Sequence, residues 1–127
     1  MIRIVQTGDA PAAIGPYSQA TVANGLVDTA GQIPLDPASM EVVGGDMDAK
    51  IRRVFDSIKA VTEAAGGSLE QVVRVTIYLT DLNHFPLVNE IMAEYFSEPY
   101  PARAAVGVAA LPKGVPVEMD AIVDLAS

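Results

Sequence analysis

Cysteine is absent from this chain of 127 residues, and that absence excludes several kinds of site. No disulfide can crosslink the fold, no thiolate can bind zinc, and no cysteine can act as a nucleophile. Only one histidine is present, so a metal would depend on carboxylates. Neither an EF-hand pattern nor the H-E-x-x-H pattern occurs, so the sequence gives no support to metal chemistry.

Basic residues are also scarce, with eight Lys and Arg against sixteen Asp and Glu and a net charge of −8. Affinity for nucleic acid depends on cationic side chains along the phosphate backbone. Attraction to an anionic membrane surface depends on basic residues in the same way. We therefore expect neither nucleic acid nor a membrane as a partner.

Long apolar runs are missing, since none approaches the roughly 20 residues that cross a bilayer. Residues 1–9 become polar too early for the apolar core of a signal peptide, so we expect a cytoplasmic protein. Hydrophobic residues nevertheless make up 50% of the chain, which is enough to fill a core. The length is typical of a single domain, here residues 1–127.

A tight hairpin is the clearest local signal in the first third of the chain. Asn24-Gly25 separates two strand-like runs, residues 20–23 and 26–30. Both residues tolerate the positive φ angles of a type I′ turn, so the pattern predicts two antiparallel strands.

Two helices are predicted from apolar residues repeating at the helical period. The first extends from Met47 to Ala65, with Asp46 or Asp48 as its N-terminal cap and Gly66-Gly67 at its end. The second covers residues 86–96 and starts with a proline, whose missing N–H is harmless in a first helical turn.

Three further strands are predicted, over residues 72–80, 102–109 and 117–125. Alternation in the first of these divides its side chains between a core face and an opposite face. We expect the core face to carry Val73, Val75, Ile77 and Leu79, and the opposite face Val72, Arg74, Thr76 and Tyr78. The order of elements indicates an α+β fold with helices on one face of a mixed sheet.

The sheet has small or apolar residues on both faces, and two helices can cover only one of them. Beyond Pro101, Ala104 and Val106 alternate with Arg103, Ala105 and Gly107. We infer that another subunit packs on the second face. The alternative is that small side chains there simply tolerate water.

Arg103 and Glu118 are the charged residues with the clearest chemical potential. Arg103 is surrounded by alanine and glycine, which leaves room for a ligand carboxylate on its planar guanidinium. The connecting loop suggests that the last two strands pair antiparallel, which places Glu118 opposite the Arg103 strand. A carboxylate there can orient a water molecule. The alternatives are an ordinary ion pair or a snorkelling side chain for Arg103, and a solvated strand face or a salt bridge with a neighbour for Glu118 and Asp120.

Three other polar residues give weaker signals. Tyr17 follows a Gly-Pro bend that presents its hydroxyl, although loop aromatics more often pack. Asn89 lies beside the apolar stripe of the second helix, a place where such residues often face water. His84 has no partner pattern, no G-x-S-x-G motif occurs, and the two Gly-Gly pairs lack the Lys-Ser/Thr of a phosphate loop.

Four segments, read together, resemble the RidA/YjgF family of reactive-intermediate deaminases. They are APAAIGPYSQA at 10–20, AGQIP at 30–34, DLNHF followed by VN at 81–89, and PAR, LPK and VE within 101–118. The resemblance covers nearly the whole chain. It implies a chorismate-mutase-like fold with a six-stranded mixed sheet and two helices on one face. It also implies a homotrimer with its sites in the clefts between subunits.

The resemblance further implies a reaction, the hydrolysis of 2-imino acids to 2-keto acids and ammonia without a cofactor or metal. The imino acids arise from 2-aminoacrylate or 2-aminocrotonate enamines. By the same resemblance, Arg103 holds the substrate carboxylate, and Glu118 orients the attacking water or binds the imine end. The substrate-binding positions that it implies are Tyr17, Ala30, Gly31, Asn89 and Ala105.

Four positions depart from the family's usual pattern. Ala30 stands where serine is common, Ala105 where cysteine is common, Gly107 where glutamate is frequent and Met92 where an aromatic residue is frequent. These changes bear on the identity of the substrate more than on the reaction.

Three other functions remain open at this stage. One is a deaminase for a pathway-specific enamine of the aminoacrylate or aminomuconate type. Another is a regulatory module that binds 2-keto acids without turnover. A ribonuclease or translation inhibitor is the third, and the negative charge disfavours it.

Overall fold

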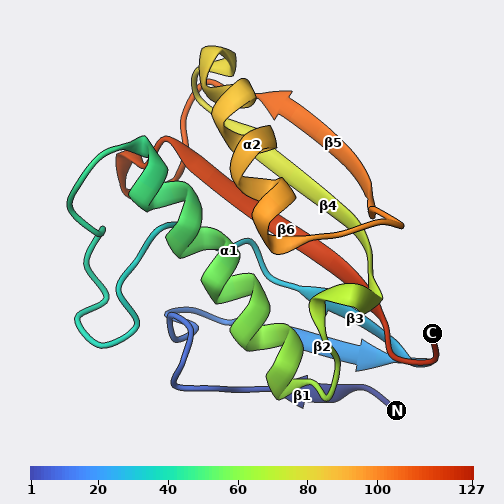
Figure 1. Cartoon of the computed structure of the whole chain (residues 1–127). Helices are drawn as coiled ribbons and strands as arrows, with labels where there is room; N and C mark the ends of the chain where they lie inside the picture. The colour runs from blue at the N-terminus through green and yellow to red at the C-terminus, as the bar shows by residue number, and fades with distance from the viewer.

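The computed structural model describes residues 1–127 and has one six-stranded mixed sheet with two helices on one of its faces (Figure 1). The strands lie in the order β1-β2-β3-β6-β4-β5, and only β4 and β5 are parallel. The expected α+β class is confirmed. The strands are β1 (Arg3–Val5), β2 (Ala20–Ala23), β3 (Leu26–Thr29), β4 (Val72–Leu79), β5 (Ala102–Gly107) and β6 (Val117–Asp124), and the helices are α1 (Met47–Ala64) and α2 (Phe85–Tyr95).

The predicted hairpin is present between β2 and β3. Its two turn residues, Asn24 and Gly25, have φ angles of 53° and 76°, and Ala23 pairs with Leu26. Both positive φ values are those that a type I′ turn requires. The edge strand β1 was not anticipated, because three residues are too few to show an alternating pattern.

The predicted first helix is also confirmed. The Asp46 carboxylate accepts a hydrogen bond of 3.0 Å from the backbone N–H of Ala49, which fixes the N-terminus of α1. Gly66, with a φ of 98°, follows its C-terminus. The apolar stripe of the helix is buried against the sheet through Ile51, Val54, Phe55, Ile58 and Val61. Neither helix has the length and apolarity that a bilayer crossing requires.

The expected alternation in β4 is wrong at its start. A bulge between Val72 and Arg74 places Val72 in the core, whereas Val73 is 42% exposed. An extra residue in one strand reverses the alternation, so Val72 and Val75 lie on the same face. From Val75 onward the prediction holds, with Ile77 and Leu79 in the core.

The expected pairing of the last two strands is also wrong. β6 lies between β3 and β4, while β5 lies on the far side of β4 as an edge strand. The chain between β5 and β6 therefore crosses the end of β4 instead of forming a hairpin. Both strands are slightly shorter than predicted, ending at Gly107 and Asp124.

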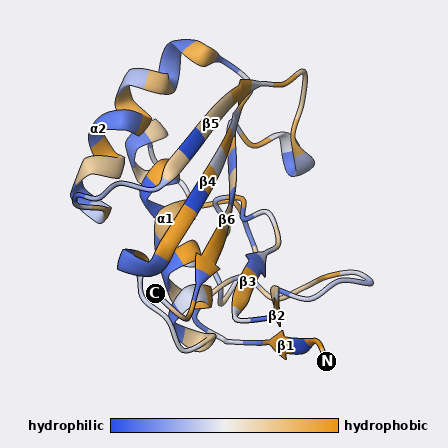
Figure 2. Cartoon of the chain, turned by 90° about the vertical axis from the view of Figure 1, so that its right-hand side faces the viewer, coloured by the Kyte–Doolittle hydropathy of each residue, from blue (hydrophilic) through white to orange (hydrophobic).

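The sheet face away from the helices is open in the single chain (Figure 2). Alternation places Ala104 and Val106 of β5 on this open face, next to Thr76 and Tyr78 of β4. Val106 is 41% exposed. The expectation that this face packs on another subunit stays a prediction.

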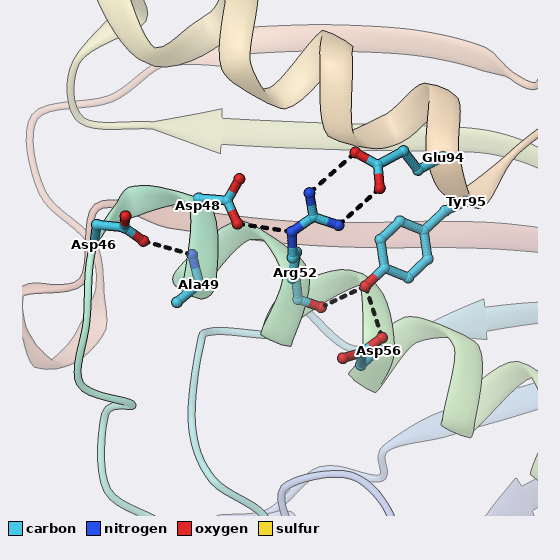
Figure 3. Close-up of polar contacts among 7 residues, drawn as sticks. All are labelled: Asp46, Asp48, Ala49, Arg52, Asp56, Glu94 and Tyr95. Carbon is cyan, nitrogen blue, oxygen red and sulfur yellow. Dashed lines mark hydrogen bonds and ion pairs between the residues drawn. The ribbon is translucent and has the colours of Figure 1, made fainter.

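Polar contacts of Arg52 and Tyr95 join α2 to α1 (Figure 3). Arg52 lies 2.7 Å from Asp48 on its own helix and donates two hydrogen bonds of 3.0 Å to the Glu94 carboxylate of α2. The Tyr95 hydroxyl donates to Asp56 at 2.8 Å. Because a bidentate pair and a hydroxyl bond constrain both rotation and sliding, they fix which face of α2 turns towards β5.

Burial and the hydrogen bond to Asp56 raise the pKa of Tyr95 to about 12. Since the folded state favours the neutral phenol, this stabilisation is complete below pH 10 and is lost as the pH rises from 10 towards 12. We expect Tyr95→Phe to cost about 1 kcal/mol of unfolding free energy at neutral pH. This difference should shrink above pH 10, as measured by urea unfolding. Tyr100→Phe, at a position 57% exposed, is the control, and identical pH profiles for wild type and Tyr95→Phe would contradict the prediction.

Candidate functional site

The predicted site residues fall into two groups on opposite faces of the sheet. Arg103 pairs with Val75 of β4, whose side chain is in the core, so Arg103 lies on the helix side. Glu118 pairs with Tyr78, whose side chain lies on the open face. The expectation that Glu118 faces the Arg103 strand is therefore wrong, because β4 separates the two strands and the side chains point to different faces.

The Arg103 half of the site consists of Arg103, Asn89, Ala105 and the side chains of α2 around them. Arg103 Nη1 donates to Asn89 Oδ1 at 2.7 Å, and the guanidinium lies 4.8 Å from the centre of the Phe85 ring. These contacts fix the plane of the guanidinium. The other guanidinium nitrogens, Nε and Nη2, have no partner, and no carboxylate forms an ion pair with Arg103. The ordinary ion pair considered for Arg103 is thus not present.

A cavity of about 410 Å³ borders the Arg103 guanidinium. Half of its lining residues are apolar, and the others include one amide and one cation. The residues that line it are Asn89, Met92, Ala93, Tyr100, Pro101 and Arg103. A ligand with a carboxylate at one end and an apolar group at the other matches this distribution of walls.

The Glu118 half of the site lies on the open face and consists of Glu118, Tyr17, Ala30 and Gly31. All four line a second cavity, of about 420 Å³. Gln32 and Met119 exchange two backbone hydrogen bonds of 2.7 and 3.0 Å, which hold Gly31 beside the Glu118 side chain. A Cβ at position 31 would clash with the Glu118 carboxylate, so a larger residue here would displace that side chain from its present position.

The environment of Glu118 favours the protonated form of its carboxyl group. Burial, with a smaller contribution from the nearby Asp120 charge, raises the pKa of Glu118 above its ordinary value. Asp120 is itself held by the Tyr78 hydroxyl, which donates to its carboxylate at 3.0 Å. A carboxylate whose pKa is raised is a stronger proton acceptor than an ordinary glutamate.

The structure changes the interpretation of several residues. Asn89 does not simply face water, because it bonds Arg103. Tyr17 is 51% exposed and borders the Glu118 cavity instead of packing in the core. Phe85 was missed, although it precedes Asn89 by four residues and so shares its helical face. His84 contributes to neither half, and no cluster of three or more histidine or acidic side chains is placed to hold a metal ion.

Comparison with known proteins gives consistent matches over almost the whole chain. The family model described as endoribonuclease L-PSP matches residues 7–125. A RutC family protein of Pyrococcus horikoshii is 51% identical over 122 residues, covering 96% of this chain and 97% of the relative. A 2-iminobutanoate/2-iminopropanoate deaminase of Dermatophagoides farinae is 43% identical, covering 95% and 94%. The crystal structure of RidA from an Antarctic Psychrobacter superposes with a TM-score of 0.92 at 50% identity, covering 96% and 98%.

The contribution of Asp120 to the Glu118 half can be measured directly. We expect Asp120→Asn to lower the pKa of Glu118, because a like charge is removed, yet to leave it above its ordinary value, because burial remains. The introduced amide oxygen can still accept from Tyr78. The measurement is an NMR titration of the side-chain carboxyl carbons. Asp124→Asn, on the same face of β6, is the matched control, and an equal shift in both variants would contradict the assignment.

Proposed function

The chain belongs to the endoribonuclease L-PSP family, the family of the RidA proteins, and on this premise we propose that it hydrolyses 2-imino acids to 2-keto acids and ammonia. The observation that carries the proposal is the Arg103 guanidinium, which is held in place by Asn89 and Phe85 yet has no acidic partner. The relatives named 2-iminobutanoate/2-iminopropanoate deaminases, from Dermatophagoides farinae and Capra hircus, add support.

In the proposed reaction, Arg103 binds the substrate carboxylate through its free N–H groups, and this fixes the imine carbon in place. Glu118 takes a proton from a water molecule as the water oxygen attacks that carbon. Glu118 returns that proton to the imine nitrogen, and a carbinolamine forms. The hydroxyl proton of the carbinolamine then passes to its amino nitrogen, and cleavage of the C–N bond releases ammonia and leaves the 2-keto acid. Because an imine is already electrophilic, positioning and one proton acceptor suffice, and the reaction requires no cofactor or metal.

The two halves of the site lie on opposite faces of one sheet, so a substrate only a few ångströms long cannot touch both in a single chain. We therefore place the reaction between copies of the chain, with the Arg103 half of one subunit facing the Glu118 half of its neighbour. A chorismate-mutase-like homotrimer, with the open faces packed together, provides such clefts. The exposed apolar residues of the open face, such as Val106, support this assembly.

The identity of the imino acid depends on the cavity beside Arg103. Met92 and Ala93 give this cavity of about 410 Å³ flexible or small walls, which leaves space for more than a methyl or ethyl side chain. A deaminase for a longer, pathway-specific enamine is therefore the second candidate. Relative rates on short aliphatic imines and on longer enamines distinguish the two. Ribonuclease activity is disfavoured by the net charge of −8.

Deaminase activity can be tested in a coupled reaction with a serine or threonine dehydratase. Adding the protein should speed the appearance of the keto acid and lower the imine that semicarbazide traps. Arg103→Ala should lose this effect by a factor of about 100 or more, because a desolvated bidentate ion pair is lost. Arg53→Ala, which removes an arginine whose side chain hydrogen-bonds only to Ser57, is the control. No acceleration at any protein concentration would reject the deaminase and leave a binding module.

The placement of the site between subunits predicts complementation of two inactive variants. Arg103→Ala and Glu118→Gln chains, unfolded together and refolded, should form mixed trimers. Some clefts then receive an intact Arg103 half from one chain and an intact Glu118 half from its neighbour. Random mixing should restore about a quarter of the wild-type activity. Each variant refolded alone is the control, and a mixture as inactive as its components would place the whole site in one chain.

A further inference from the structure

The amide of Gln19 is buried and fully bonded to one irregular loop. Gln19 is 3% exposed. Its Oε1 accepts from the Thr7 backbone N–H at 2.7 Å. Its Nε2 lies 3.0 Å from the Thr7 carbonyl oxygen, 3.3 Å from that of Ala10 and 2.8 Å from that of Pro11. One side chain therefore satisfies backbone groups of three residues that no strand or helix pairs.

The same residue joins this loop to the segment beside Glu118. The Gln19 carbonyl oxygen accepts from the Ala30 N–H at 2.8 Å, directly before Gly31. Residues 7–18 make no hydrogen bond to the rest of the chain except those to the Gln19 amide. This loop includes Pro11, Ala12, Ile14 and Tyr17, which line the cavity of the Glu118 half.

We propose that Gln19 is a positioning residue, whose amide holds the 7–18 loop and Tyr17 in register with Gly31 and Glu118. The proposal rests on the proposed function in taking the Glu118 half as the part of the site where water attacks. Only an amide meets the requirement, because the loop presents carbonyl oxygens that need donors and an N–H that needs an acceptor. A carboxylate has no donor for the carbonyl oxygens, and a thioether has neither a donor nor a strong acceptor.

The split of the site gives this role a characteristic kinetic signature. Substrate carboxylate binding depends on Arg103, which belongs to the other half and has no contact with Gln19. Loosening the 7–18 loop should therefore affect the attack on the imine more than the capture of the substrate. We expect kcat to fall about 10- to 100-fold, since small misplacements of catalytic groups cost that much. KM should change less than threefold.

The test compares Gln19→Met and Gln19→Glu, which keep the length of the side chain, with wild type. Gln71→Met is the matched control, because the Gln71 amide is also bonded to backbone, at Ser68, Leu125 and Ser127, but far along the chain from both halves. Backbone amide exchange over residues 7–18 should be at least 10-fold faster in both Gln19 variants and unchanged in Gln71→Met. Gln19→Asn, one methylene shorter, is the milder substitution if the others do not fold.

Three results would overturn the proposal: wild-type exchange over residues 7–18 in Gln19→Met, a wild-type kcat in that variant, or equal effects of Gln71→Met. If Gln19→Met behaves as wild type, the side chain only fills space. Failure of the proposed function is seen separately, as a wild-type protein that does not accelerate imine hydrolysis. In that event accelerated exchange confined to residues 7–18 still supports the role of Gln19 in ordering the Glu118 cavity, and unchanged exchange rejects it.

Discussion

The position of β4 between β5 and β6 is the constraint on which the site depends. It places Arg103 on the helix side of the sheet and Glu118 on the open side. The cation is thus kept away from the nearest strand carboxylates, and its free N–H groups stay available to an external anion. The pKa of Glu118 in turn stays raised by burial and by the Asp120 charge, with no cation acting to lower it. Had β5 and β6 formed a hairpin, the two groups could have neutralised each other.

The elements that the sequence predicted well are those whose signals are local. The first helix has a complete apolar stripe and a capping aspartate, and the hairpin has the Asn24-Gly25 pair that its turn needs. The order of the strands was predicted wrongly at the C-terminal end, because a loop that crosses the end of a strand and a loop that forms a long hairpin look alike in sequence. The bulge at Val73 was also not predicted, because the alternation of residues does not reveal where an extra residue is inserted.

For the site, the sequence motifs predicted which residues belong to it but not which of them contact one another. Arg103 and Glu118 were both selected from their residue types, their positions and the family resemblance, and their proposed roles stay predictions. The Asn89–Arg103 bond could not be predicted, because it depends on how α2 docks, and this docking is fixed by Arg52 and Glu94. The close approach of Gly31 to Glu118 is likewise visible only in three dimensions, where the Glu118 side chain occupies the space of a Cβ.

The unpaired guanidinium of Arg103 has a kinetic consequence in so acidic a protein. The proposed anionic substrate approaches a chain of net charge −8, and salt screens the repulsion until the two are within about a Debye length, about 8 Å at physiological salt. Capture is then a short-range event, governed by collisions with the cleft and not by attraction from a distance. Added salt screens the repulsion outside the cleft more than it weakens the desolvated contact within it. Association should therefore become faster with ionic strength, the opposite of electrostatically steered enzymes.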